Sequence, residues 1–466
     1  MEIFSQHRGT DAQVRVLMDD TVLPPKLLNR LSSAAEAVRR HDHVHIFSHY
    51  DADGISAAGI LAKTLLRAGK EFEVTLLTTL DDPAMDRIRE SGAKCLILSD
   101  IGASYIPELE ALGGDVVVLD HHTPSADSET VHYANPHLVG IDGMTGGCGA
   151  TMAFLFSLQM SDKNWDLVQI AFAGMTGDRQ HINGMSGLNS LLLDGALERG
   201  LIRTSSGSLI PPGPLSKSLY LSTDPYIRGV SGDTDGSRRM LKDAGIPNSF
   251  SSSDLDADAD RKLSSLIAVR LTIQGVSVQT MQEISRTRYH LPDWDMDAET
   301  MADLFNACGR LGMGGISVGM CLGSDDCLQK AVSANDDYKR MIVSAVTALD
   351  AKGLIQKENI QYFSSTESGF TGIVCGAAMQ FIGDPNKPTV GINCAEDIAK
   401  ASARGMWGQL DRGVDLSVAM RVAAESVGGN GGGHRIASGA SFKSEKKDLF
   451  LDQLDQLIGD QIRTAT

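Results

Sequence analysis

Several features that would place this chain in other protein classes are missing from its sequence. No run of eighteen apolar residues occurs in its 466 residues, so we expect no transmembrane helix. The seven cysteines include no CxxC pair, and their odd number argues against a disulfide framework or a zinc knuckle. Residues 1–20 contain no apolar signal-peptide core, so we predict a cytoplasmic location.

Positive charge is also scarce. The chain has 42 Lys and Arg residues against 59 Asp and Glu residues, which gives a net charge of −17. This balance is unfavourable for binding nucleic acid over the whole surface. It leaves open a local groove of Arg and Lys, or a site where metal ions supply the positive charge that a phosphate group needs.

The length and composition predict a globular protein of two or three domains, with 42% hydrophobic residues. We expect a parallel α/β domain over residues 1–200, where strands and helices alternate. Residues 201–335 are rich in Ser, Gly, Pro and Asp and are interpreted as a linker with an inserted module. A smaller α/β domain is predicted over residues 336–466.

Short apolar segments and helical periodicity predict the elements of the first domain. The predicted strands cover residues 43–47, 72–77, 94–98 and 116–119. The predicted helices cover residues 24–40, 54–68, 83–91, 104–112, 150–160, 165–175 and 183–200.

The rest of the chain is predicted in the same way. Helices are expected at 264–275, 298–309, 338–351 and 447–462, with a further helix from Val414. Strands are expected at 372–375, 388–392 and 436–442.

Carboxylates and histidines stand at the ends of three predicted strands. They are His49, Asp51 and Asp53 after the first strand, Asp100 after the third, and Asp120, His121 and His122 after the fourth. Because the carboxyl ends of parallel strands share one edge of a sheet, we expect these groups to converge on one crevice. Asp178, after an apolar helix, could join them from the side.

Taken singly, these residues have ordinary explanations. One Asp at a strand end is most often a helix N-cap, and one His is more often structural than a ligand. The arrival of all the clusters at one edge favours a metal site, because such carboxylates would repel each other strongly without cations. Mixed carboxylate and imidazole ligands suit Mn²⁺ or Mg²⁺, and two such ions form the usual clamp for phosphoester hydrolysis.

The motifs HYDADG, SDIG, LDHH and TGDR resemble, in order and spacing, the four motifs of the DHH phosphoesterase superfamily. The resemblance implies that the metal ligands are Asp51, Asp53, Asp100, His121 and Asp178. It also implies that Asp100 bridges two ions, that Asp120 orients the histidine pair, and that His122 lies near phosphate. Bacterial RecJ proteins have Asp at the position of His49 and archaeal relatives often have His, so His49 is either a ligand or a substrate contact.

A glycine-rich segment, Gly428 to His434, precedes the predicted strand 436–442. Consecutive glycines let backbone N–H groups approach an anion, although such a segment alone would more often be a flexible loop. Upstream, the sequence KASARG at 400–405 has the spacing found in DHHA1 domains, which also carry a GGGH motif. That resemblance implies phosphate binding by Ser402, Arg404, Gly432, Gly433 and His434, across a cleft from the metals.

Within the superfamily, several further segments are similar to archaeal RecJ-like proteins, above all the group of GINS-associated nucleases. These segments are 135–143, 187–189, 225–227 and 304–310. The resemblance implies an exonuclease for single-stranded DNA or RNA, whose inserted module contacts GINS or other replisome proteins. Two alternatives stay open: a phosphatase for short oligonucleotides or nucleotides, and a mainly structural replisome subunit.

Overall fold

The computed structural model describes residues 23–365 and 369–465. The expected absence of a signal peptide concerns residues 1–20 and lies outside the described residues. Within these ranges, no helix is long and apolar enough to cross a membrane. The chain divides into two compact units, one of Met1–Ser206 and Arg286–Asn335, the other of Gly207–Ser285 and Asp336–Thr466. The three-part division from the sequence stays a prediction.

A five-stranded parallel sheet forms the centre of the first unit, in the order β2-β1-β3-β4-β5. The strands are β1 (His43–His49), β2 (Glu71–Leu77), β3 (Cys95–Ser99), β4 (Asp115–Leu119) and β5 (His132–Ala134). The first four confirm the predicted strands. β5 was not predicted, because three residues are too few to form a recognisable apolar pattern.

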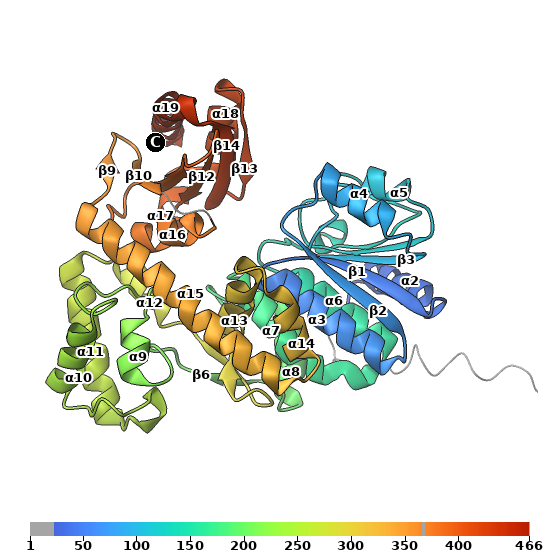
Figure 1. Ribbon diagram of the computed structural model, residues 1–466, viewed down its shortest axis with the longest axis horizontal. Coiled ribbons are helices and arrows are strands. Elements are labelled where there is room, and N and C mark those ends of the chain that lie inside the picture. The colour runs from blue at the N-terminus through green and yellow to red at the C-terminus, as the bar shows by residue number, and fades with distance from the viewer. Residues whose placement is uncertain (1–22, 366–368, 466) are drawn as a thin grey trace, which may run out of the picture. The chain divides into compact units, whose positions relative to one another are not determined.

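Helices cover both faces of this sheet (Figure 1). On one face lie α2 (Pro25–Arg39), α3 (Ala52–Arg67), α6 (Gly149–Met160), α7 (Val168–Gly177) and α8 (Gly187–Glu198). On the other face lie α4 (Asp82–Glu90) and α5 (Ile106–Glu110). Ile46 packs in the hydrophobic core on the α3 side of the sheet, the first core, and its neighbour Phe47 packs in the core on the α4 side, because side chains alternate along a strand. The predicted parallel α/β architecture is therefore confirmed.

The segment that returns to the first unit adds a small antiparallel sheet and two helices. The sheet contains β6 (Arg203–Ser205), β7 (Arg288–Leu291) and β8 (Met296–Asp297). The helices α13 (Ala298–Arg310) and α14 (Gly314–Cys321) pack against α3. Buried Phe305 and Cys308 of α13 extend the first core, so the unit is completed by residues distant in sequence.

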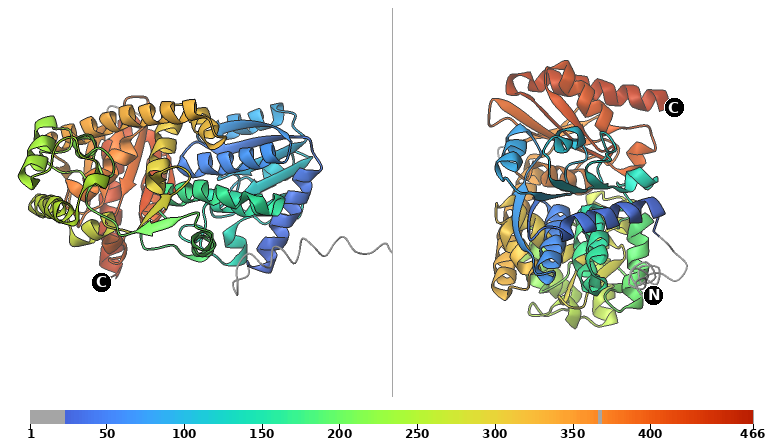
Figure 2. Two further views of the ribbon diagram at one scale, coloured as in Figure 1. Left: turned by 90° about the horizontal axis from the view of Figure 1, so that it is seen from below. Right: turned by 90° about the vertical axis from the view of Figure 1, so that its right-hand side faces the viewer.

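The C-terminal sheet of the second unit has six strands in the order β13-β14-β12-β11-β10-β9. They are β9 (Ile355–Gln356), β10 (Gln361–Ser365), β11 (Thr389–Asn393), β12 (Ile398–Arg404), β13 (Asn430–Gly433) and β14 (Ala437–Lys443). Only β10 and β11 run parallel. Alanines of β12 share a core with α18 (Leu416–Ser426) and α19 (Lys447–Ala465), the red helices of Figure 2.

The remaining helices of this unit precede and flank that sheet. They are α9 (Leu215–Tyr220), α10 (Thr234–Ala244), α11 (Ala257–Gln274), α12 (Val278–Ile284), the part of the long α15 (Asp325–Lys352) that follows Asn335, α16 (Thr371–Phe381) and the short α17 (Trp407–Leu410). The amide of Gln274 donates to the backbone oxygen of Phe381 over 2.7 Å. Arg228 pairs with Asp350 of α15, so residues 207–285 are fastened to the C-terminal residues.

One predicted strand is wrong. Residues 372–375 lie within α16, and the strand of this region is β10, which ends at Ser365. A short apolar run does not distinguish a strand from a buried helix. Here the run continues through small residues to Phe381, and seven of the eleven residues are buried, which suits a helix between other layers.

The glycine-rich segment is not a free loop. Asn430–Gly433 forms the edge strand β13, which pairs with β14 in antiparallel register. Gly432 and Gly433 have φ angles of 154° and 136°, which residues with a side chain rarely adopt. Glycine is therefore required here for an irregular edge strand.

Candidate metal centre

The three strand-end clusters converge, as expected from the parallel sheet. β1, β3 and β4 are neighbours, and the chain leaves β1 toward β2 on one side and continues with β3 on the other. This change of direction marks the point where α/β sheets open a crevice at their carboxyl ends. His49, Asp100 and His121 stand there, and Asp178, the C-cap of α7, completes the set.

The turn after β1 positions two carboxylates. Asp51 caps α3, since its Oδ1 accepts a 3.1 Å hydrogen bond from the backbone of Gly54. Its Oδ2 lies 2.9 Å from Nδ1 of His49. A side chain on Gly54 would collide with the backbone of His49, so glycine is needed for this close turn. Asp51 is therefore the N-cap of α3, and its second oxygen is free to face His49 and the other acidic side chains.

Asp53 is held from the opposite direction. Its carboxylate accepts hydrogen bonds of 2.6 and 2.9 Å from the backbone of Gly149 and Ala150, the first residues of α6. A helix N-terminus favours a negative charge, which helps to offset the burial of this side chain. Asp53 is only 1% exposed, and its Oδ2 lies 3.7 Å from Nε2 of His121.

Asp100 lies at the centre of the cluster. Its Oδ1 is 3.2 Å from Nε2 of His121, and its Oδ2 is 3.5 Å from Nδ1 of His49. The backbone has a φ of 58°, a strained conformation for a residue other than glycine, and such strain is concentrated at functional sites. Oδ1 is buried and makes no hydrogen bond of acceptable geometry in the described structure. A buried oxygen left in this state fits a cation as its missing partner.

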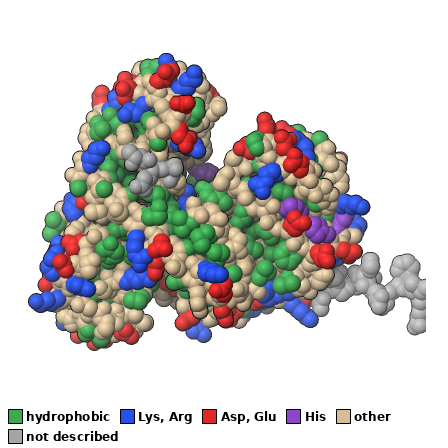
Figure 3. Space-filling view, viewed as in Figure 1, with side chains coloured by type: hydrophobic (Ala, Val, Ile, Leu, Met, Phe, Trp, Pro, Cys, Tyr) green, Lys and Arg blue, Asp and Glu red, His purple; other side chains and the backbone are tan. Residues whose placement is uncertain are grey.

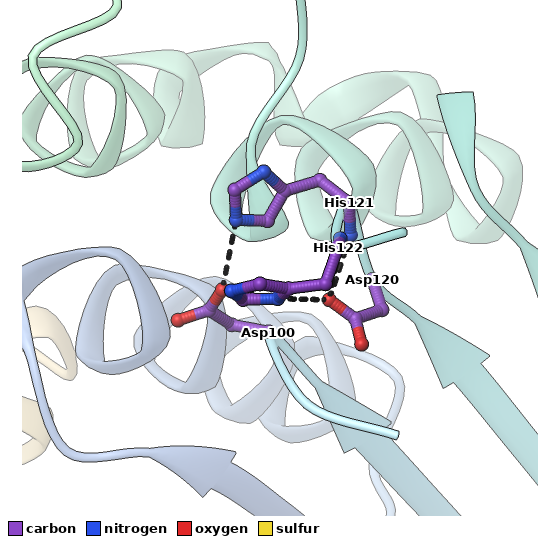
Figure 4. Close-up of side chains that lie close together, drawn as sticks. All are labelled: Asp100, Asp120, His121 and His122. Carbon is purple, nitrogen blue, oxygen red and sulfur yellow. Dashed lines mark hydrogen bonds and ion pairs between the residues drawn. The ribbon is translucent and has the colours of Figure 1, made fainter. Parts of the chain in front are cut away.

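Asp120 holds the two histidines that follow it (Figure 4). Its carboxylate accepts from the backbone N–H groups of Ala103, His121 and His122, and its Oδ1 lies 2.8 Å from Nδ1 of His122. With these partners Asp120 is suited to orient the histidines. The ring of His122 is partly exposed, with 44% of its side chain accessible.

The charges of the cluster conflict in the absence of cations. Burial and the neighbouring carboxylate of Asp100 raise the pKa of Asp178 to about 7, although His121 opposes the shift. Burial and the same neighbour also raise the pKa of Asp53. Burial opposes charge on His121, but the surrounding carboxylates hold its pKa well above the usual value. This pattern fits carboxylates that repel one another and retain protons until a cation replaces them.

The donor atoms fit divalent ions. Three groups have one donor atom each within 4.8 Å of one another: Asp100 with Asp120, His121 and His122; His49 with Asp51 and Asp100; and Asp53 with His121 and Asp178. Asp100 belongs to two groups, and its two oxygens face different histidines. The set offers carboxylate oxygens and imidazole nitrogens and no thiolate, which suits Mn²⁺ or Mg²⁺.

Three contributors to this centre were not predicted as such. The carbonyl of Gly143 lies 2.7 Å from Nδ1 of His121, and the amide of Gln180 donates to the same carbonyl. The side chain of Asn306, on α13, accepts from the backbone of Ala52 over 3.0 Å. The segments that contain Asn306 and Gly143 were singled out only through their family resemblance. No spacing in the sequence points to Gly143 or Gln180.

The residues predicted to bind phosphate gather on the C-terminal sheet. Ser402 and Arg404 lie two residues apart on β12, hence on one face, which is turned toward Gly372 of α16. Any side chain on Gly372 would lie 2.7 Å from the Arg404 guanidinium. In the strand pairing, Ser402 lies opposite Gly439 of β14, and Gly439 lies opposite Gly432 of β13. Gly433 ends β13, and His434 follows in the exposed turn to β14.

Comparisons with known proteins match two regions of this chain. A family model described as the DHH family, N-terminal domain, matches residues 43–176, and one described as the DHHA1 domain matches residues 359–460. An uncharacterized protein of Methanocaldococcus jannaschii, MJ0831, is 30% identical over 435 residues, covering 91% of this chain and 95% of its own length. The single-stranded-DNA-specific exonuclease RecJ of Thermus thermophilus is 28% identical over 158 residues, 32% of this chain and 24% of that protein.

Solved structures share the fold at lower identity. RecJ of Thermus thermophilus in complex with Mn²⁺ has a TM-score of 0.60 at 17% identity and covers 95% of this chain, which spans 56% of the RecJ chain. CDC45 of Entamoeba histolytica also has a TM-score of 0.60, at 10% identity, and the match covers 93% of this chain and 98% of that one.

Proposed function

We propose that this chain, which belongs to the DHH superfamily of phosphoesterases, is an exonuclease that hydrolyses phosphodiester bonds of single-stranded DNA or RNA. Membership of the superfamily carries the coarser statement that it is a metal-dependent phosphoesterase. The observation that supports catalysis best is the state of Asp100, whose strained backbone holds a buried oxygen without a hydrogen bond. A subunit with only a structural role would gain nothing from such strain.

The proposed metal ligands are the acidic and histidine side chains gathered around Asp100. They are His49, Asp51, Asp53, Asp100, His121 and Asp178. We propose two Mn²⁺ or Mg²⁺ ions, with Asp100 shared between them because its two oxygens face His49 and His121. Such ions would supply positive charge against the phosphate and lower the pKa of a bound water.

The protein's own groups then orient the substrate. Asp120 fixes Nδ1 of His122, which leaves Nε2 of this partly exposed ring to donate to a phosphate oxygen. The carboxylate of Asp120 also raises the pKa of His122, against the effect of burial, so the ring can carry positive charge. Ser402, Arg404, Gly432, Gly433 and His434 are the proposed contacts for further phosphates. Arg404 presents a planar fork suited to them.

A single strand is the proposed substrate because the chain lacks the excess of positive charge that a duplex would need. On the face in view in Figure 3, Lys and Arg side chains are scattered among acidic ones. With a net charge of −17, the chain is poorly suited to hold the two phosphate backbones of a duplex. A replisome partner such as GINS, bound through the inserted module, stays a prediction from the family resemblance.

One assay separates the candidate functions. An end-labelled DNA or RNA strand is incubated with Mn²⁺ alone, annealed to its complement, and as a dinucleotide. We expect a ladder from the single strand and little product from blunt duplex. Equal rates on both would contradict single-strand specificity, and cleavage of the dinucleotide alone would favour the phosphatase. No hydrolysis of any of these, with Mn²⁺ bound, would favour a structural role.

A further inference from the structure

We propose that Gln180 is a positioning residue for the metal centre, and that it acts on His121 through the carbonyl of Gly143. The inference rests on the proposed function, because it concerns how the proposed ligand is held. Gln180 follows Asp178 by two residues, in the turn after α7, and it is 5% exposed.

The first step concerns the proton of His121. Nδ1 of this ring lies 2.7 Å from the carbonyl oxygen of Gly143. A carbonyl oxygen can only accept, so the hydrogen must stand on Nδ1. Nε2 is thereby presented to Asp100 and Asp178, at 3.2 and 3.3 Å. A ligating histidine is commonly fixed in this way by a partner behind the ring.

The second step concerns what holds the carbonyl. The side-chain amide of Gln180 donates to the same oxygen of Gly143 over 2.9 Å. A side chain on Gly143 would collide with the backbone of His121, so the peptide is packed closely behind the ring. The carbonyl therefore receives two hydrogen bonds, and the one from Gln180 stays in place whatever His121 binds.

The third step concerns the orientation of the amide itself. Nδ2 of Asn189, on α8, donates to Oε1 of Gln180 over 2.6 Å. The hydroxyl of Thr151, on α6, donates to Oδ1 of Asn189 over 2.6 Å. If the Gln180 amide were flipped, its oxygen would face the carbonyl of Gly143 and its NH₂ would face that of Asn189. Asn189 and Thr151 are fully buried, so water cannot replace these partners.

The hydrogen-bonded series Thr151, Asn189, Gln180 and Gly143, here called the relay, is also linked to a second proposed ligand. Thr151 directly follows Gly149 and Ala150, whose backbone N–H groups hold Asp53. The start of α6 is thus connected to Asp53 by its backbone and to His121 through Thr151, Asn189, Gln180 and Gly143. The relay couples the positions of Asp53 and His121, two proposed ligands that are 68 residues apart in the sequence.

The test uses Gln180→Met, which keeps the length of the side chain and removes both amide contacts. Its matched control is Gln169→Met, since Gln169 is a fully buried glutamine of α7 whose amide contacts Asp293 instead of the metal centre. Mn²⁺ affinity is measured by calorimetry, with thermal unfolding as the check on folding. We expect Gln180→Met to weaken Mn²⁺ binding by about 10–100-fold, the usual effect of losing a partner behind a ligand. Gln169→Met should leave it unchanged.

Two further variants keep the inference testable if Gln180→Met folds poorly. Gln180→Glu retains an acceptor for Asn189 but cannot donate to Gly143 when ionised. Asn189→Asp replaces the donor that orients Gln180. Both should weaken Mn²⁺ binding, and hydrolysis by either variant should recover at high Mn²⁺. Wild-type affinity in folded variants would overturn the role of Gln180. Tight Mn²⁺ binding by the wild type without hydrolysis would instead overturn the proposed function and leave this inference intact.

Discussion

The edge of the parallel sheet and the glycine-rich edge of the C-terminal sheet carry the two proposed sets of functional residues in opposite surroundings. At the first, the side chains of Asp100 and His121 are only 3% and 6% exposed. At the second, His434 and Arg435 are exposed, and Gly432 and Gly433 have no side chain to bury. Groups that hold ions must be fixed and partly desolvated, whereas groups that follow a flexible phosphate chain need to stay accessible.

The largest effect is expected at the buried edge. Asp100→Ala should lower the rate of hydrolysis by on the order of 10³-fold or more, because it removes the carboxylate proposed to lie between the ions. Folding should persist, since the change relieves the repulsion between this carboxylate and Asp53. The labelled-strand assay measures the loss of hydrolysis, and thermal unfolding of the metal-free protein measures whether the variant still folds.

The control for that variant is Asp115→Asn. Asp115 stands at the opposite end of β4, where Arg40 and His41 pair with it. This variant should lose some stability and keep its activity. If both variants lost activity equally, the location of the catalytic site at the carboxyl edge would be wrong.

A smaller effect is expected on the C-terminal sheet. Arg404→Ala and His434→Ala should each weaken substrate binding by roughly 10–100-fold, the usual loss for a hydrogen bond to a charged group. Mn²⁺ affinity should not change. Binding of a labelled strand and calorimetry with Mn²⁺ test the two statements, with Arg340→Ala as the control, since Arg340 pairs with Asp337 on α15. Loss of Mn²⁺ from either test variant would contradict the separation of roles.

The pH dependence should also separate the two edges. Burial, with Asp100 adding to it, raises the pKa of Asp178 to about 7, and neighbouring carboxylates raise that of His121 despite its burial. An ion must displace these protons, so Mn²⁺ affinity should fall roughly tenfold per pH unit, for each proton displaced, as the pH is lowered below 7. Calorimetry at several pH values tests this, and Asp178→Asn should flatten the profile.

The same shifts predict the stability of the metal-free protein. Both groups have a raised pKa in the folded state, so they stabilise it below their unfolded pKa values. That stabilisation is lost as the pH rises through the folded values. Over the range from about pH 4 to pH 8, these two groups should therefore make the metal-free protein less stable as the pH rises. Thermal unfolding of the metal-free wild type and of Asp178→Asn should differ in that sense. A difference that grew in the opposite direction would refute the raised pKa values.

The smallest expected effect is that of salt. The candidate cations on the C-terminal sheet and its neighbouring segments are Lys400, Arg404, Arg412 and Arg435. For two or three contacts with a single strand, the logarithm of the binding constant should fall with that of the salt concentration with a slope of roughly −1.4 to −2. Binding measured over a salt series gives this slope. A much steeper slope would reveal a broad basic surface and contradict the single-strand argument.

Particular residues show how far sequence reasoning extends. Asp100 and His121 could be brought to one edge because each follows an apolar strand, and the carboxyl ends of parallel strands coincide. Gly143 and Gln180 could not be found in this way. Their contacts with the ligands depend on where two loops settle after the helices have packed. The strand predicted at 372–375 failed for a related reason, because burial on more than one side removes the periodicity that distinguishes a helix.

The sequence by itself determined the alternation of strands and helices, the sheet edge at which carboxylates and histidines collect, and the resemblance of its motifs to one superfamily. These properties are local, because they follow from the periodicity of apolar residues and from the residues that come after each strand. Only the tertiary structure decided that Asp100 is strained with a buried oxygen that makes no hydrogen bond, that α13 supports the turn after β1, and that the glycines form an edge strand. Those outcomes depend on which distant surfaces pack together, and packing energy is set by whole elements rather than by neighbouring residues in the chain.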